Sequence, residues 1–504
     1  MKGALNHGAV STAARIAALA IAANASALFS QAPVTAPPGV EPWKAIVIPP
    51  LHAFHPVQPK RVELRNGIVI FLEEDHELPF ISGDITIRGG ERDVPPAKSG
   101  LIDLYQESWR NSGSATINGD KLDDLLEAKA AKVETGGDVD STSVSWNCLK
   151  GDEDQVFGIA VDLLEHPAFE EGKLQLAKQQ MAAAIVRRND QASSIAGREA
   201  ALLVYGKNNP YARTPELATV MSVGVGDLKQ WHDQTVAANN IIISVDGDFD
   251  AAEMERKLRA AFESMPRGKA ASAPTEDFAG PKPGLYLVNK PDINQSNVAI
   301  LGLGTERNNP DYYALSVMNE IFGGGFGSRL FQNVRTKQGL AYAVGGSYGA
   351  SYDHPGIFRV AAGTRSENTL KAAQEMLRQI GELKTQPFSD EELQSAKDQV
   401  LNSFIFEYDS REKVLDTRTR LEFYGYPEDF LEKYRAGVEK VTTADLQRVA
   451  KKYIDPSKLA VLIVGNESEF GGSLDALGMG KPQILDITIP MPPGMAPPPG
   501  GPGQ

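Results

Sequence analysis

The stretch Leu174-Gln-Leu-Ala-Lys-Gln-Gln180 is matched, 219 positions later, by Leu393-Gln-Ser-Ala-Lys-Asp-Gln399, with identical residues at five of the seven positions. Two further pairs follow in the same order at an offset of 218: Gly226-Asp-Leu-Lys-Gln-Trp231 with Ala444-Asp-Leu-Gln-Arg-Val449, and Ile241-Ile-Ile-Ser-Val-Asp-Gly247 with Leu459-Ala-Val-Leu-Ile-Val-Gly465. Amphipathic helices often look alike, but three matches at nearly one offset indicate that a whole domain is duplicated.

Each of the two repeated blocks combines strand and helix patterns. Around Asn66-Gly67, the apolar residues of Val62–Leu72 predict a β-hairpin. Helical periodicity occurs at residues 100–110, 121–131, 154–164, 173–188, 312–322, 370–383, 390–406 and 443–453, and strand patterns occur at residues 143–149, 298–302, 342–348 and 356–361. Because strands and helices come in runs rather than in strict alternation, we expect an α+β fold. Its unit would be a tandemly duplicated α/β-layer domain, with an antiparallel sheet covered by helices.

The charge and the cysteine content exclude several classes of protein. The 504 residues contain 51 Lys and Arg against 65 Asp and Glu, a formal net charge of −14, so we expect no nucleic-acid binding and no attraction to anionic membranes. Cys148 is the only cysteine, which excludes an internal disulfide bond and a cysteine-ligated zinc. Cys148 lies in an alternating strand pattern, and we expect it, like Trp109, Trp146 and Trp231, to be buried.

The first 32 residues have the pattern of a secretory signal peptide. Lys2 and Arg15 precede the apolar run Ile16–Ala23, and small residues that suit a cleavage site follow. Because this run is too short to span a bilayer comfortably, we expect cleavage and export rather than membrane insertion. The mature protein would be periplasmic in a Gram-negative host.

Low-complexity segments divide the rest of the chain. Residues 33–60 and 268–283 are interpreted as linkers rich in proline and small residues, and residues 471–504 as a Pro/Gly-rich tail. The repeats therefore belong to an N-terminal block, residues 61–267, and a C-terminal block, residues 284–470.

The C-terminal block contains the segment Gly323-Gly-Gly-Phe-Gly-Ser-Arg-Leu-Phe331, followed by Val334-Arg335 and Gly339-Leu-Ala-Tyr342. The segment lacks the lysine and the following Ser/Thr of a nucleotide-binding loop. It resembles instead a recognisable C-terminal segment of the M16 family of zinc peptidases, to which pitrilysin, insulinase and the mitochondrial processing peptidase belong. In the N-terminal block, Asn66-Gly67 precedes strands and a helix opened by Gly100-Leu101, in the order of that family. The resemblance covers about residues 61–467 and implies an M16-type, metallohydrolase-like domain in each block.

At the metal-binding helix, the sequence departs from the family pattern. Catalytic members carry H-x-x-E-H, in which two histidines one turn apart bind zinc and the glutamate is the general base. Counted from Gly100-Leu101, the equivalent residues here are Asp103, Gln106 and Glu107. Carboxylates replace both histidines, and a glutamine cannot take up a proton at neutral pH. We therefore expect this chain to bind no zinc and to have no catalytic residue of its own.

No other metal site is strongly indicated. The later helix offers Gln179 and Gln180 near the position of the family's third ligand, a glutamate, and no two of the seven histidines are four residues apart. Asp103 and Glu107 share a helix face and could hold a hard cation. An exposed ion pair between Glu107 and Arg110, three residues on, explains the charges more simply.

The C-terminal block keeps the family's Arg and Tyr. In two-chain bacterial M16 peptidases, one chain carries the zinc helix and the other supplies an Arg/Tyr pair across a shared cavity; Arg335 and Tyr342 match that pair. Guanidinium and phenol groups can hold a peptide backbone or stabilise an oxyanion. In the alternative interpretation, Arg335 forms an ordinary salt bridge at a helix end and Tyr342 is half-buried on a strand.

The resemblance implies two functions of different classes. In the first, the chain is the zinc-free subunit of an exported heterodimeric peptidase. Its partner would be an M16 subunit with intact H-x-x-E-H and bound zinc, and its substrate an unfolded peptide. In the second, the chain keeps the fold for non-enzymatic peptide binding or assembly. A homodimer with an unrecognised metal is a weaker third possibility.

Overall fold

The computed structural model describes residues 57–271 and 276–492. The expected signal peptide, nearly all of the first linker and the end of the Pro/Gly-rich tail lie outside these residues. Within the described ranges, no helix combines the length and the apolar character that crossing a bilayer requires.

The N-terminal block forms a six-stranded sheet with the order β1-β2-β6-β3-β5-β4. Its strands are β1 (Lys60–Glu63), β2 (Val69–Glu74), β3 (Phe80–Arg88), β4 (Lys132–Gly137), β5 (Ser141–Leu149) and β6 (Ile241–Gly247). The predicted hairpin is confirmed, since β1 and β2 are antiparallel and the turn contains Gly67 at a φ of +96°, which favours glycine. The sheet is not wholly antiparallel as expected, because β2 and β6 are parallel.

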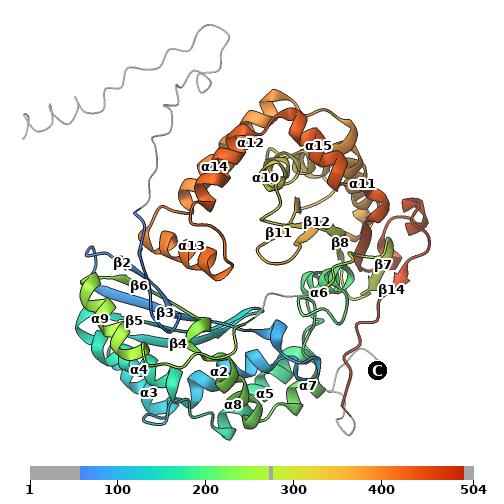
Figure 1. Ribbon diagram of the computed structural model, residues 1–504. Coiled ribbons are helices and arrows are strands. Elements are labelled where there is room, and N and C mark those ends of the chain that lie inside the picture. Colours follow the sequence, from blue (N-terminus) through green and yellow to red (C-terminus); the bar gives the residue numbers. More distant parts are fainter. Residues whose placement is uncertain (1–56, 272–275, 493–504) are drawn as a thin grey trace, which may run out of the picture. The chain divides into compact units, whose positions relative to one another are not determined.

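The C-terminal block forms a second six-stranded sheet with the order β10-β12-β8-β13-β7-β14. Its strands are β7 (Gly284–Asn289), β8 (Gln295–Leu303), β10 (Ala343–Tyr348), β12 (Ile357–Arg365), β13 (Ala460–Gly465) and β14 (Gln483–Ile484); β9 (Thr305–Glu306) and β11 (Ala350–Ser351) pair separately. The parallel pair β7/β13 repeats β2/β6 of the first sheet. Val69 lies opposite Ile242, and Gly284 lies opposite Ala460, 218 positions beyond Ile242. The equivalent strand order and the shared parallel pair therefore confirm the duplication, and Figure 1 shows the two sheets with their helices.

Helices pack on each sheet through one continuous core. The first core contains α2 (Leu101–Ser112), α3 (Gly119–Ala128), α4 (Glu153–Glu165), α5 (Glu171–Val186), α7 (Leu217–Ser222), α8 (Val225–Thr235) and α9 (Ala251–Phe262). The second contains α10 (Tyr312–Phe322), α11 (Thr369–Thr385), α12 (Asp390–Phe406), α14 (Phe430–Lys440) and α15 (Thr443–Tyr453). Two further helices are α6 (Ala192–Tyr205) and α13 (Arg411–Phe423). As expected, Trp109, Trp146, Trp231 and Cys148 are buried in the first core.

Most of the predicted helices are confirmed, three of them with the same bounds: α10, α12 and α15. Helix α3 is displaced from the expected range, 121–131. It begins earlier because the side-chain oxygen of Asn118 accepts a hydrogen bond from the backbone N–H of Lys121 at 3.0 Å and caps the helix. It ends earlier because Ala130 has a φ of +48°, which is not helical.

Each block supplies one helix to the sheet of the other block. Helix α6 of the N-terminal block packs Ile195 and Val204 on β7, β8 and β13 of the second sheet. Helix α13 of the C-terminal block packs Leu415 on Phe71 and Ile242 of the first sheet. The two helices begin 219 positions apart, the offset of the repeat, so they are the same element exchanged between the blocks.

Two arginines hold the ends of α13 on the first sheet. At its N-terminal end, Arg411 pairs with Glu73 of β2 at 3.1 Å. At its C-terminal end, Arg88 of β3 donates hydrogen bonds to the backbone carbonyls of Glu422 and Phe423, at 3.1 and 2.9 Å. A cation at these carbonyls is favourable, because the last carbonyls of a helix lack partners within the helix.

We expect Leu415→Ala to lower the free energy of unfolding by about 2–4 kcal/mol, because Leu415 is the buried apolar anchor of α13 at 2% exposure. Urea denaturation of variant and wild type measures the difference. The control Leu176→Ala, at a position on α5 that is 49% exposed, should change it by less than about 0.5 kcal/mol. Equal effects of the two substitutions would contradict the packing described for α13.

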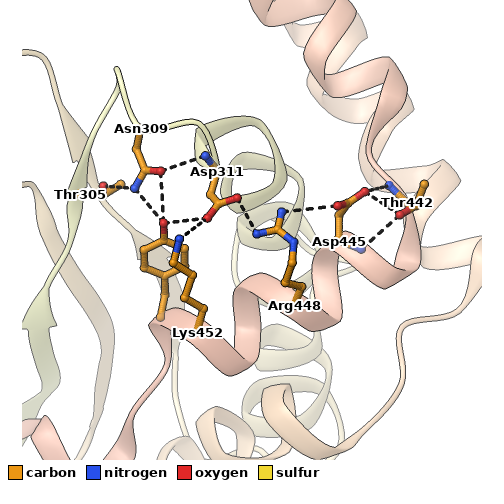
Figure 2. A network of polar contacts seen from close by, with 8 residues as sticks. Thr305, Asn309, Asp311, Thr442, Asp445, Arg448 and Lys452 are labelled. Atoms are coloured by element: carbon orange, nitrogen blue, oxygen red, sulfur yellow. Dashed lines mark hydrogen bonds and ion pairs between the residues drawn. The ribbon is translucent and has the colours of Figure 1, made fainter.

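A network of ion pairs anchors the start of α10 to α15 (Figure 2). The carboxylate of Asp311, the residue before α10, accepts hydrogen bonds from Arg448 at 2.7 Å and from Lys452 and Tyr453 at 2.8 Å each. Burial alone would raise the pKa of Asp311, but hydrogen bonds from Lys452, Arg448 and Tyr453 outweigh it and lower the pKa to about 2. A carboxylate before the first turn also suits the helix dipole of α10.

We expect Asp311→Asn to lower the free energy of unfolding by about 1–2 kcal/mol at neutral pH. Because the pKa of Asp311 in the folded protein lies below its unfolded value of about 4, the contribution is complete above about pH 4. It is lost as the pH falls towards the folded pKa of about 2.

Denaturation of the variant and the wild type across this acidic range measures the effect as a shrinking difference in stability. The control is Asp429→Asn, which precedes α14 and removes an exposed ion pair with Lys433; it should cost less than about 0.5 kcal/mol. A difference for Asp311→Asn that does not change with pH would contradict the assignment.

Candidate functional site

Helix α2 carries the residues that replace the family's metal ligands. Its start is fixed by Glu91, whose carboxylate accepts hydrogen bonds from the backbone N–H of Gly100 at 2.9 Å and from the Ser99 hydroxyl at 3.0 Å. The helix packs directly on β4: a side chain at Gly137 would place its Cβ 2.5 Å from Ile102 Cγ2. The polar face of α2 is thus held at the edge of the first sheet.

The expected ion pair between Glu107 and Arg110 is wrong. Arg110 pairs with Asp123 at 2.7 Å and donates to the backbone carbonyl of Val133 at 2.5 Å, because its side chain reaches across to β4. The carboxylate of Glu107 instead accepts a hydrogen bond from Asn111 at 2.7 Å. Within the described part of the chain, Asp103 has no ion pair.

Asp103 lines a cavity of about 560 Å³ between α2, α5 and α6, which we call the first pocket. Helix α5 contributes Met181, Ala184 and Ile185 to this pocket, and Arg187 and Arg188 follow directly after the helix. Gln179 and Gln180, expected near the third-ligand position, are exposed and do not line the pocket. Counting along α5 does not fix which of its faces turns to α2, so the sequence alone could not show that Met181, Ala184 and Ile185 line the pocket instead.

The donor set of the first pocket does not fit zinc. Asp103 is the only carboxylate in its lining, which also includes Arg187, Arg188 and Arg198. Across residues 57–271 and 276–492, no group of three or more His, Cys, Asp or Glu side chains is placed to hold a metal ion. Burial, and then the charge of Asp138, raise the pKa of Asp103. The first pocket therefore has a basic lining rather than a set of metal ligands.

Arg335 and Tyr342 lie together at the edge of the second sheet. The Arg335 guanidinium carbon is 5.4 Å from the centre of the Tyr342 ring and 4.8 Å from the centre of the Phe331 ring. Tyr342 is 85% exposed, and within the described residues Arg335 has no ion pair and no side-chain hydrogen bond. The alternative interpretation of a salt-bridged Arg and a half-buried Tyr is wrong. That Arg335 and Tyr342 bind a peptide backbone or stabilise an oxyanion stays a prediction.

The segment from Phe331 to Tyr342 is shaped by its backbone. Residues Phe331–Thr336 form a π-helix, η6, and the N–H of Gly339 then bonds to the carbonyl of Arg335 at 2.9 Å. Gly339 has a φ of +62°, which favours glycine at this turn. The N–H of Tyr342 bonds to the carbonyl of Gly363 at 3.0 Å, which places the phenol where β10 begins.

Comparisons with known proteins agree with the fold. The family described as Peptidase M16 inactive domain matches residues 222–400. A Helicobacter pylori protein named non-peptidase homolog YmxG is 24% identical over 80% of this chain and 93% of its own length. A Bacillus subtilis protein named as an uncharacterized zinc protease, also YmxG, is 24% identical over 77% of this chain and 93% of its length.

A solved structure, a peptidase M16 inactive domain from Pseudomonas fluorescens, has a TM-score of 0.73, with 23% identity over 81% of this chain and 98% of that one. The fold is therefore that of the M16 inactive domains. The chain is similar to M16 homologues over most of its length, and the resemblance to the M16 family that its motifs predict is confirmed.

We expect the triple substitution Asp103→His, Glu107→His and Ala184→Glu to create a site for one zinc ion. The two histidines restore the family's spacing on α2, and Ala184, which lines the first pocket together with Asp103, takes the position of the third ligand. A matched variant carrying the same two histidines and Gln180→Glu should bind zinc at least about tenfold more weakly. Calorimetric titration with zinc measures both affinities. Equal affinities would contradict the position assigned to Ala184.

Proposed function

We propose that this chain is the zinc-free subunit of an exported, heterodimeric M16 peptidase. It would contribute Arg335, Tyr342 and half of a peptide-binding chamber to a partner that carries H-x-x-E-H and zinc. The observation that carries the proposal is the unpaired guanidinium of Arg335 beside the exposed phenol of Tyr342, in a chain whose own metal helix lacks ligands.

The chemistry of the pair supports a role with peptide. Within the described residues, the side chain of Arg335 contacts two aromatic rings and forms no hydrogen bond, so its five N–H donors can bind carbonyl or carboxylate oxygens of a peptide. Such charge-assisted hydrogen bonds are among the strongest in proteins. An exposed tyrosine next to an arginine is also the residue combination that dominates many binding interfaces.

Strand β10 supports the same role. It is an edge strand, because it stands at the end of the second sheet, and it begins directly after Tyr342. Its sequence, Ala-Val-Gly-Gly-Ser-Tyr, contains none of the charges or prolines that protect edge strands from pairing; β4, at the edge of the first sheet, has Lys132 and Glu134. An extended peptide could therefore add to β10 and pass beside Arg335 and Tyr342.

Export is the part of the proposal that rests on residues 1–32. Their charge and apolar pattern supports cleavage by a signal peptidase. N-terminal sequencing of the protein isolated from its own host tests it, since a start near residue 1 would contradict export.

A second candidate is a non-enzymatic peptide-binding or assembly protein of the same fold. This candidate is favoured by the Helicobacter pylori relative, which is named a non-peptidase homolog. Native mass spectrometry of the protein purified from its host separates the two candidates. A 1:1 complex with an H-x-x-E-H chain and one zinc supports the peptidase subunit, whereas a metal-free monomer or homodimer supports the second candidate.

We expect Arg335→Ala to lower kcat/KM of the assembled complex by about 10–100-fold and Tyr342→Phe to lower it to a smaller extent, because each removes hydrogen-bond donors from the bound peptide. Peptide turnover by the purified complex measures the effect. The control is Arg365→Ala. The side chain of Arg365 is 80% exposed and lies 3.9 Å from Glu367, so its removal should leave turnover unchanged. Normal turnover by Arg335→Ala, with assembly intact, would refute the assigned role.

A further inference from the structure

The duplication gives the first pocket a counterpart in the C-terminal block. Helices α2 and α10 have the same sequence of buried and accessible positions when they are aligned at an offset of 213. Under this alignment, Asp103 corresponds to Ser316, and Glu107 corresponds to Glu320. The polar face that carries the degenerate metal positions in α2 therefore has a polar equivalent in α10.

A cavity of about 700 Å³, which we call the second pocket, lies on this face of α10. Its lining includes Val400 and Ser403 of α12, which are 219 positions after Met181 and Ala184 of the first pocket. It also includes Thr417 of α13, 219 positions after Arg198 of α6. The two pockets are thus the same site of the repeat, formed twice from equivalent helices.

The second pocket is lined by aromatic rings. Tyr312 of α10 lies 5.5 Å from Tyr434 of α14, measured between ring centres. Phe404 lies 4.6 Å from Tyr408, and both line the same cavity. The faces of tyrosine and phenylalanine rings attract cations.

Glu320 is the unsatisfied group of the second pocket. Within the described residues its carboxylate has no ion pair and no hydrogen bond, and its Oε2 atom is buried. The carboxylate rests against Gly324, where a Cβ would lie 2.5–2.7 Å from both carboxylate oxygens. Burial raises the pKa of Glu320. A buried carboxylate without a partner is costly, and a cation brought by a ligand would remove that cost.

Three cationic residues line the second pocket, Arg307, Lys413 and Arg420, and two of them have other partners. Arg307 stacks on Tyr352, with its guanidinium carbon 4.0 Å from the ring centre, and donates to the Tyr352 hydroxyl at 3.0 Å. Lys413 pairs with Asp409 at 2.7 Å. None of the three, Arg420 included, forms an ion pair with Glu320 in the described structure, so the site for a cation at Glu320 is open to a ligand.

We propose that the second pocket binds the cationic side chain of a peptide, arginine or lysine, with its charged group on Glu320 and its stem among the tyrosine rings. The occupant is a peptide rather than a small cation because residues Gly346–Ala350, from the end of the edge strand β10 onward, form one wall of the pocket. A peptide added to β10 would bring a side chain to the cavity. The inference rests on the proposed function, and it adds that the bound peptide carries an arginine or a lysine.

The test uses the full mature chain without a partner and two labelled 12-residue peptides of Ala, Ser and Gly. They differ only at the centre, where one has arginine and the other citrulline, its uncharged analogue. Fluorescence anisotropy should show that the wild type binds the arginine peptide at least about tenfold more tightly. In Glu320→Gln, which keeps the shape of the side chain, the preference should fall to about twofold or less.

Two further variants make the test specific. Gly324→Ala should also reduce the preference for the arginine peptide, because the added methyl group displaces the Glu320 carboxylate but does not remove its charge. Glu107→Gln, at the equivalent position of α2, should leave the preference unchanged. Equal binding of the two peptides by the wild type, no binding of either, or an undiminished preference in Glu320→Gln would each overturn the proposal.

Failure of this inference and failure of the proposed function give different results. An arginine preference that depends on Glu320, in a chain recovered without any H-x-x-E-H partner, would retain the pocket and reject the heterodimeric peptidase. A zinc-containing complex whose turnover depends on Arg335, with no arginine preference, would reject the pocket alone.

Discussion

The exchange of α6 and α13 is the constraint on which the rest of the structure depends. The helices of each block cover one face of its own sheet, and a helix from the other block packs on the opposite face. Burial of Leu415 on Phe71 and Ile242 is therefore stability that neither block has alone. The same helix lines the second pocket with Lys413 and Thr417, so the interaction that joins the blocks also shapes a candidate binding site.

The fold was largely predictable because its signals are local. Asn66-Gly67 marks the first hairpin, and the periodicity of residues 312–322, 390–406 and 443–453 fixes three helices to the residue. The exchange was not predictable. Helix α13 has few apolar residues, and the sheet that it covers lies more than 160 positions earlier in the chain, so no local pattern identifies it. Arg110 is a similar case, because its partners on α3 and next to β4 become neighbours only in the folded chain.

The candidate site was predictable in kind but not in detail. The glycine-rich segment located Arg335 and Tyr342, and the structure adds that the phenol is exposed and the guanidinium has no acid beside it. The repeat offset was visible in the sequence, yet applying it to Asp103 requires the burial pattern of α10, since the offset for that helix is 213 rather than 218 or 219. The two pockets have diverged in opposite directions. The first is lined by arginines and has Asp103 as its one carboxylate, whereas the second has aromatic walls and an unpaired carboxylate, Glu320, beside Glu407 and Asp416.

The exchanged helices also set the order in which the chain can fold. Phe71 and Ile242 are among the earlier residues to leave the ribosome, but the helix that covers them ends at Phe423. That face of the first sheet stays uncovered until most of the chain has been made, which favours a late, concerted folding step over independent folding of the two blocks. For the same reason, a single cut between the blocks would leave two fragments that each contain the helix that the other needs, and they would stay associated.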